Sequence, residues 1–176
     1  MLQGCTMNIM LNDQEKLGLF EALDDEHRAW ATYDQVIKTF GPVRPFINIR
    51  EAEARHIAAV AGLLQRYGLQ APGNAWIGNV RHYPSVAAAC LDGITAEIAN
   101  AALYDRLMAS TDREDILAVY RALQEASQQR HLPAFQRCSG VSQPADSSRG
   151  KGCCHGHGAS GSGRSRGQRH QGGSLR

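Results

Sequence analysis

The chain has little of what membrane-spanning and all-β proteins need. In its 176 residues no apolar run approaches the roughly 18 residues of a membrane span, so we expect no transmembrane segment. Aromatic residues make up only 6% of the sequence. The alternation of β-branched or aromatic residues with polar ones, which is typical of strands, is nowhere sustained. These absences favour an all-α protein.

The chain also lacks a cysteine framework. It contains five cysteines, an odd number, of which three are scattered and two are adjacent: Cys5, Cys90, Cys138, Cys153 and Cys154. This usage predicts that the cysteines form no disulfide framework and that the protein occupies a reducing compartment.

A secretory signal is missing from the first residues, where no basic segment precedes an apolar one. The sequence therefore predicts a cytoplasmic protein. The stretch Leu2-Gln3-Gly4-Cys5 is similar to the end of a bacterial lipoprotein signal. A start codon upstream of Cys5 would instead predict a lipoprotein or a periplasmic protein.

Charge is divided unevenly along the chain, whose formal net charge is +2. Residues 139–176 contain six of the 19 basic residues, one of the 17 acidic residues and 10 of the 18 glycines. We expect this Gly/Ser/Arg-rich tail to be disordered, because it has too little apolar surface to offset the entropy of ordering it. The tail's arginines lack interleaved aromatic residues for base stacking, so no specific nucleic-acid binding is predicted.

Four helices are predicted between the glycines and prolines of the remaining chain. The first begins at Asn12 or Asp13, and the fourth is capped by Thr111 or Asp112. The four cover about residues 12–40, 47–67, 84–110 and 112–138, with a long connection at 70–83. Two helices, a crossover and two more helices predict one four-helix bundle over residues 12–138. Pro133 predicts an irregularity in the last helix.

Each predicted helix carries an ionisable residue near the middle of its apolar stripe. The inward positions hold three glutamates and two histidines: Glu26, Glu53, His56, Glu97 and His131. No lysine lies on these stripes. Burying an unpaired carboxylate costs several kcal/mol, so converging carboxylates need a cation, which a metal ion would supply. In the alternative, these groups form a hydrogen-bonded network in a non-catalytic helical bundle that acts as a partner-binding or structural module.

Two tyrosines repeat the same spacing. Tyr33 follows Glu26 by seven residues and Tyr104 follows Glu97 by seven, which places each pair two turns apart on one face. Each hydroxyl could hydrogen-bond an inward carboxylate and so support the metal ligands. Simple core packing is the alternative for both tyrosines.

Over about residues 12–138 the chain resembles the ferritin-like superfamily. The phrases AEIANAALYDRL and ASQQRHLPAF are more closely similar to a bacterial branch known only as a domain of unknown function. The resemblance implies one or two ions of iron or manganese and oxidoreductase activity towards iron, oxygen or peroxide. It implies Glu26 and Glu97 as terminal ligands, Glu53 as the bridge, and His56 and His131 as nitrogen ligands. Metal ions are the expected partners, and assembly into a homo-oligomer is an open alternative.

The chain departs from the superfamily at one ligand. A second Glu-x-x-His would place glutamate at position 128, where this sequence has Gln128. Gln128, about 60° from the direction of His131, and Ser127, about 40° from it, are the inward candidates. A neutral amide oxygen is a poorer bridge between two ions than a carboxylate. Three carboxylates also carry one negative charge fewer than is needed to neutralise two divalent ions. The sequence therefore predicts that a second metal ion would bind more weakly.

Overall fold

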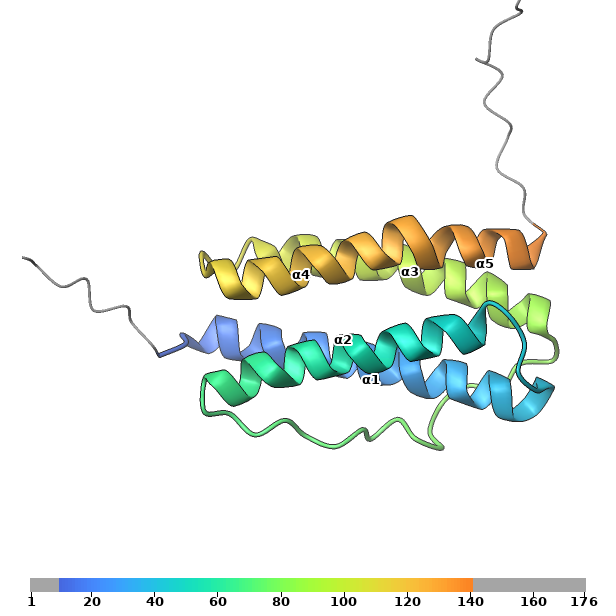
Figure 1. Ribbon diagram of the computed structural model, residues 1–176, viewed down its shortest axis with the longest axis horizontal. Coiled ribbons are helices and arrows are strands. Elements are labelled where there is room, and N and C mark those ends of the chain that lie inside the picture. Colours follow the sequence, from blue (N-terminus) through green and yellow to red (C-terminus); the bar gives the residue numbers. More distant parts are fainter. Residues whose placement is uncertain (1–9, 141–176) are drawn as a thin grey trace, which may run out of the picture. The chain divides into compact units, whose positions relative to one another are not determined.

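Helices make up about three quarters of the residues that the structure describes. The computed structural model describes residues 10–140, which belong to one compact unit, Met1–Pro144. The helices are α1 (Asp13–Phe40), α2 (Phe46–Arg66), α3 (Val86–Met108), α4 (Glu114–Ala126), the π-helical turn η1 (Ser127–His131) and α5 (Leu132–Ser139) (Figure 1). These described residues contain no strand, which confirms the predicted all-α four-helix bundle. The predicted tail lies, from residue 141 on, outside the described residues.

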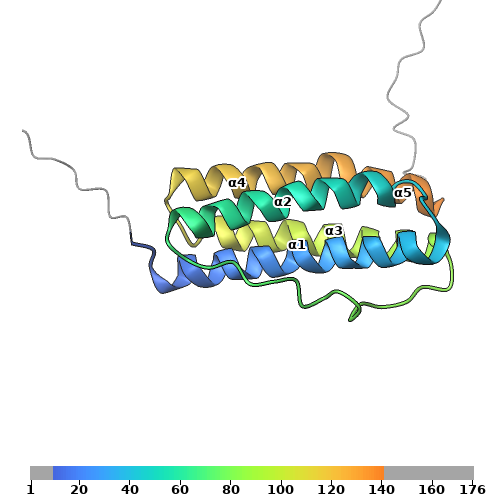
Figure 2. The same ribbon diagram turned by 60° about the horizontal axis from the view of Figure 1, so that its bottom comes forward.

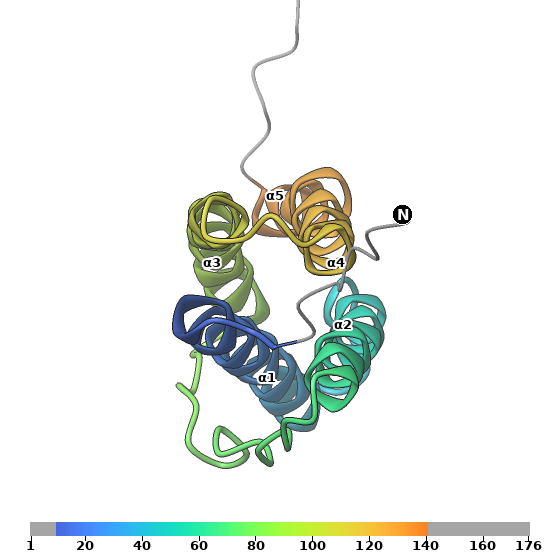
Figure 3. The same cartoon turned by 90° about the vertical axis from the view of Figure 1, so that its left-hand side faces the viewer.

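The fourth helix of the bundle consists of the consecutive segments α4, η1 and α5. Viewed along the bundle, α1 lies beside α2 and α3, and α4 with α5 completes the square (Figure 3). Helices α2 and α3 run in the same direction, so the connection between them spans the length of the bundle (Figures 1 and 2). That geometry explains why the sequence needs a long crossover there.

The helix ends follow from local side-chain chemistry. Asn12 and Glu15 form a reciprocal capping box at the start of α1, which confirms Asn12 as its N-cap. Gly41, with φ of +84°, ends the same helix. The fourth helix begins later than predicted, at Glu114, with Arg113 as its N-cap; the Thr111 hydroxyl lies outside the helix, where it donates to the buried Glu15 and accepts from the Arg113 N–H.

The core consists of two apolar clusters, and the inward glutamates and histidines lie between them along each helix. One cluster contains Leu19, Leu23, Leu64, Tyr104 and Tyr120, among others. The second contains Tyr33, Phe46, Ala89, Cys90 and Phe135, among others. In every helix the ionisable residues fall between the segments that belong to the two clusters, so the bundle has a polar layer at its middle.

A disulfide joins Cys90 of α3 to Cys138 of α5, with the Cα atoms 6.0 Å apart. The sequence predicted no disulfide framework, and this bond between two of the scattered cysteines corrects that prediction. Their separation of 48 residues has no motif-like spacing, and only the packing of α5 on α3 brings them together. The other three cysteines lie outside the described residues.

Helix α3 is the one described helix that is long and apolar enough to cross a membrane, with a mean hydropathy of 1.4 over 18 residues. A bundle helix with an alanine-rich outer face passes the same test of length and composition. The inward face of α3 carries the buried Glu97, a group that membrane spans rarely contain.

Glycine 93 allows the close approach of α3 and α5. A Cβ added to Gly93 would lie 3.0 Å from three ring atoms of the fully buried Phe135. We expect Gly93→Ala to lower the thermal midpoint, because overpacking of about 1–3 kcal/mol exceeds the helix-propensity gain of about 1 kcal/mol. Gly62→Ala in α2, where nothing lies within 4 Å, is the matched control and should raise the midpoint. A Gly93→Ala midpoint as high as that of Gly62→Ala would contradict this account.

Candidate metal centre

The structure brings all five inward residues together. Glu26 comes from α1, Glu53 and His56 from α2, Glu97 from α3, and His131 from the last residue of η1. The three glutamates are at most 4% exposed. The amphipathic pattern of each helix directs these side chains inward, and the depth at which they occur places them in one layer.

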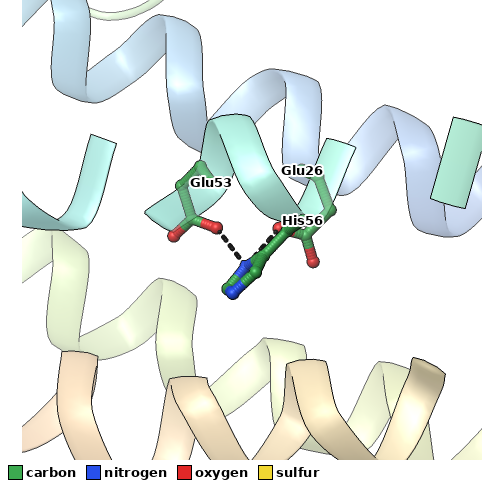
Figure 4. Close-up of side chains that lie close together, drawn as sticks. All are labelled: Glu26, Glu53 and His56. Carbon is green, nitrogen blue, oxygen red and sulfur yellow. Dashed lines mark hydrogen bonds and ion pairs between the residues drawn. The ribbon is translucent and has the colours of Figure 1, made fainter. Parts of the chain in front are cut away.

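The first group of potential ligands contains Glu26, Glu53 and His56, whose ligand atoms all lie within 4.8 Å of one another. The His56 Nδ1 atom lies 3.1 Å from Glu26 Oε2 and 2.7 Å from Glu53 Oε2. Figure 4 shows both carboxylates directed at the same ring nitrogen. The i, i+3 spacing of Glu53 and His56 on α2 is what places their side chains on one face.

The second group contains Glu53, Glu97 and His131, also within 4.8 Å of one another. The His131 Nδ1 atom lies 3.2 Å from Glu53 Oε1 and 3.6 Å from Glu97 Oε1. Glu53 therefore belongs to both groups and directs a different oxygen to each histidine. The two imidazole rings are stacked, with centroids 5.6 Å apart.

Both tyrosines donate hydrogen bonds to the glutamates, but across the bundle. Tyr104 of α3 donates to Glu26 Oε1 of α1 at 2.6 Å, and Tyr33 of α1 donates to Glu97 Oε1 of α3 at 3.1 Å. Each tyrosine thus supports the carboxylate of the other helix. Burial, with the nearby glutamates, raises the pKa of both phenols well above the usual value, so both remain neutral donors.

Ser127 lies nearer the centre than Gln128. The Ser127 Oγ atom donates to Glu97 Oε2 at 2.5 Å, whereas Gln128 Nε2 donates to the backbone carbonyl of Glu97 at 3.0 Å. A π-helix closes its hydrogen bonds one residue further along than an α-helix, so each turn holds more residues. Ser127, four residues before His131, is then closer to a full turn from His131 than Gln128, which is three residues before it. The Ser127 side chain therefore faces inward, and the Gln128 side chain is turned away from the centre. This irregularity ends just before Pro133, which lies in the first turn of α5.

Burial and mutual contact shift the pKa values of these groups in opposite directions. Burial, with the charge of Glu53, raises the pKa of Glu26 to about 8. Burial disfavours the charged imidazoles, but their hydrogen bonds to glutamates prevail and raise the pKa of His56 and of His131 to about 9. Burial likewise opposes ionisation of Glu53, yet hydrogen bonds from both histidines lower its pKa to about 2. In the metal-free protein the two imidazoles therefore supply positive charge to the carboxylates.

The same residues line a cavity of about 310 Å³. The cavity wall also includes Asp25 of α1 and Asn100 of α3, neither of which our sequence analysis identified. Asn100 stands three residues after Glu97, and that i, i+3 spacing was the available signal.

No protein-family model matches the chain, and no curated protein matches it. Two solved structures are similar. A hypothetical protein from Methanococcus jannaschii DSM 2661 has a TM-score of 0.66 and 28% identity, covering 74% of this chain and 82% of that one. A conserved hypothetical protein from Mycobacterium tuberculosis has a TM-score of 0.63 and 16% identity, covering 76% of this chain and 96% of that one. The similarity supports the bundle fold.

We expect the free energy of unfolding of metal-free protein to fall as the pH rises from neutral towards about 9. The folded-state pKa of both histidines lies above the unfolded value of 6.5, so their contribution is fully present below pH 6.5 and is lost through about pH 9. Glu26, with a folded pKa near 8, acts in the same direction. Glu53 adds no slope there, because its contribution is lost only in acid.

Denaturant unfolding of chelator-treated protein across this pH range measures the effect. His131→Gln should flatten the curve, and His82→Gln, at an exposed position in the crossover, should leave it unchanged. A stability that does not change with pH would show that the buried imidazoles are neutral.

Proposed function

We propose that this chain is a ferritin-like di-metal carboxylate protein that binds iron or manganese and acts as an oxidoreductase on iron, oxygen or peroxide. The observation that carries the proposal is the sharing of Glu53 between two groups of buried ligands. A carboxylate with one oxygen directed to each group suits a bridge between two ions. The resemblance of the sequence to the ferritin-like superfamily over residues 12–138 supports the same assignment.

The donor atoms fit such ions. Glu26, Glu53 and His56 would hold one ion, and Glu53, Glu97 and His131 the other. Sites rich in carboxylate oxygen with two imidazoles suit iron or manganese. The histidine nitrogens that face the carboxylates would have to lose their protons to bind metal, so we expect metal binding to release protons.

The bound ions would supply the redox chemistry, and the residues around them would set its conditions. Tyr104 and Tyr33 hold the terminal glutamates in place through hydrogen bonds. Apolar clusters flank the layer on either side and would make it a site of low polarity. Interactions with carboxylates are stronger in such a site than in bulk water.

A second candidate function follows from the pKa values of the histidines. With pKa values of about 9, His56 and His131 balance two of the three carboxylates at neutral pH without a metal. This favours a stable metal-free network, as in a non-catalytic bundle that acts on a partner. Metal titration distinguishes the two functions.

Removing the shared carboxylate tests the bridge. We expect wild-type protein to bind two Fe(II) or Mn(II) ions in anaerobic titration calorimetry. Glu53→Gln should abolish both binding events, because its carboxylate belongs to both ligand groups. Glu97→Gln, the matched control, should weaken one event and leave the other. Equal effects of the two variants would argue against a bridge, and no binding by the wild type would favour the non-catalytic bundle.

A fourth carboxylate at position 127 should strengthen binding of the second ion, the one held by Glu53, Glu97 and His131. We expect Ser127→Asp to tighten binding of the second ion at least tenfold, about 1.4 kcal/mol, because it supplies the missing negative charge. Gln128→Glu, whose side chain contacts the Glu97 carbonyl, should change this affinity little. Calorimetry of the two variants side by side measures the difference. A larger gain from Gln128→Glu would show that position 128 faces the ions.

In the metal-free protein Ser127→Asp should have the opposite effect. It places a second carboxylate where the Ser127 hydroxyl now donates to Glu97, and repulsion should lower the thermal midpoint. Added Mn(II) should restore the midpoint. If it does not, the layer does not bind metal.

A further inference from the structure

The Cys90–Cys138 disulfide joins the two elements that supply most of one ligand group. Cys90 lies seven residues before Glu97 on α3, and Cys138 lies seven residues after His131. Seven residues are close to two helical turns, so each cysteine lies on the same face of its helix as the ligand, about 10 Å further along the axis. The bond therefore holds α3 and the last helix together on the faces that carry Glu97 and His131.

The other ligand group does not depend on this bond. Its members belong to α1 and α2 and are Glu26, Glu53 and His56. These two helices pack on each other and are joined by the short connection 41–45. Of the two groups, only the one that contains Glu97 and His131 takes ligands from both elements that the disulfide joins. A change at the disulfide should therefore act on one ion and spare the other.

Helix α5 is short and buries one side chain completely, that of Phe135. The Phe135 ring packs over Gly93 of α3, and its centroid lies 5.4 Å from those of Tyr33 and Phe46. Cys138 lies about one turn beyond Phe135, so the disulfide is what holds the last turn of α5 on α3. Because α5 begins directly after His131, a movement of α5 changes the position of that imidazole.

The two cysteines differ in exposure. Cys90 is fully buried in the second apolar cluster, whereas Cys138 is only partly buried against it. Thiol–disulfide exchange begins when a thiolate attacks one sulfur of the bond, and we expect this attack at Cys138. The sequence predicts a reducing compartment, and disulfides in such compartments are usually transient, catalytic or redox-sensing.

We propose that the Cys90–Cys138 disulfide is a redox switch for the second ion, the one that Glu53, Glu97 and His131 would hold. With the bond formed, α5 is fixed on α3, and the ligands of both ions are held together. With the bond reduced, the end of α5 moves away from α3, His131 is less constrained, and the second ion binds more weakly. The inference rests on the proposed function, because it assigns a regulator to that metal pair.

Opening and closing of the switch each transfer two electrons. A dithiol reduces the bond: one of its thiolates attacks a protein sulfur, and its second thiol then displaces the protein, which leaves two protein thiols and one new disulfide. Hydrogen peroxide closes it: a cysteine thiolate attacks the O–O bond to give a sulfenic acid and hydroxide, and the other thiol then displaces water. Peroxide is among the substrates of the proposed function, so the oxidant that closes the switch is one that the two-ion centre would consume.

The test uses the full chain with Cys5→Ser, Cys153→Ser and Cys154→Ser, so that only the Cys90–Cys138 pair responds to a thiol reagent. Oxidised protein is compared with protein reduced anaerobically by dithiothreitol, which is removed before titration with Mn(II). We expect reduction to leave the first binding event unchanged and to weaken the second about tenfold or more, as when the support of a metal ligand is lost. Cys138→Ser, the matched control, should behave like the reduced protein and should not respond to dithiothreitol.

Hydrogen exchange of the metal-free protein gives a second readout. Reduction should speed amide exchange in α5 and η1 and leave exchange in α2 unchanged, because the bond restrains the packing of α5 on α3. A disulfide that only stabilises the whole fold would speed exchange in all helices alike. If Cys138→Ser does not fold, Cys90→Ala takes its place.

Equal Mn(II) affinities in the oxidised and the reduced protein would overturn the inference and make the disulfide a structural cross-link. Equal weakening of both binding events would also contradict it, because the effect would then not be confined to the helices that the bond joins. The same holds if dithiothreitol reduces the bond only in denaturant. An oxidised protein that binds no Mn(II) would instead contradict the proposed function, and control of the second ion would fail with it.

Discussion

The burial of three carboxylates in one layer is the constraint on which the rest of this bundle depends. Glu26, Glu53 and Glu97 are each nearly inaccessible to solvent, and their ion-pair partners among the described residues are histidines, not lysines or arginines. A lone buried carboxylate would be strongly destabilising. The two histidines, two tyrosine hydroxyls and one serine hydroxyl that converge on them are therefore required for the fold as well as for any metal. Apolar clusters above and below the layer, with the Cys90–Cys138 disulfide beside one of them, stabilise the bundle on both sides.

The last helix meets this constraint by changing its winding. In a regular α-helix neither Ser127 nor Gln128 aligns with His131. The π-helical turn brings Ser127 into line, so its hydroxyl can donate to Glu97 while His131 contacts Glu53 and Glu97. A π-helical turn inside an α-helix is rare and is often found at functional sites. Here it directs a neutral hydroxyl, rather than a fourth carboxylate, to Glu97.

Helical periodicity was sufficient to predict the bundle, the crossover and the five inward residues, because each depends on spacing within one helix. Features that depend on contacts between helices were not predictable in this way. Tyr33 and Tyr104 lie on the predicted faces, but which glutamate each one contacts depends on how α1 faces α3. Pairing of Cys90 with Cys138 depends on how α5 packs on α3. The choice between Ser127 and Gln128 depends on a π-helical turn that no propensity scale signals.

The helices divide the chemistry of the layer unequally, and this division explains which helices contribute most of the cavity lining. Helix α2 and the last helix supply both histidines and the shared Glu53, whose mutual contacts fill the space between those helices. Helices α1 and α3 each supply one glutamate and one tyrosine, and these reach across to one another. Most of the residues that line the cavity belong to α1 and α3, and several of them, such as Ala29, Ala96 and Ala99, are small, so these two helices leave more space at the layer than α2 and the last helix do.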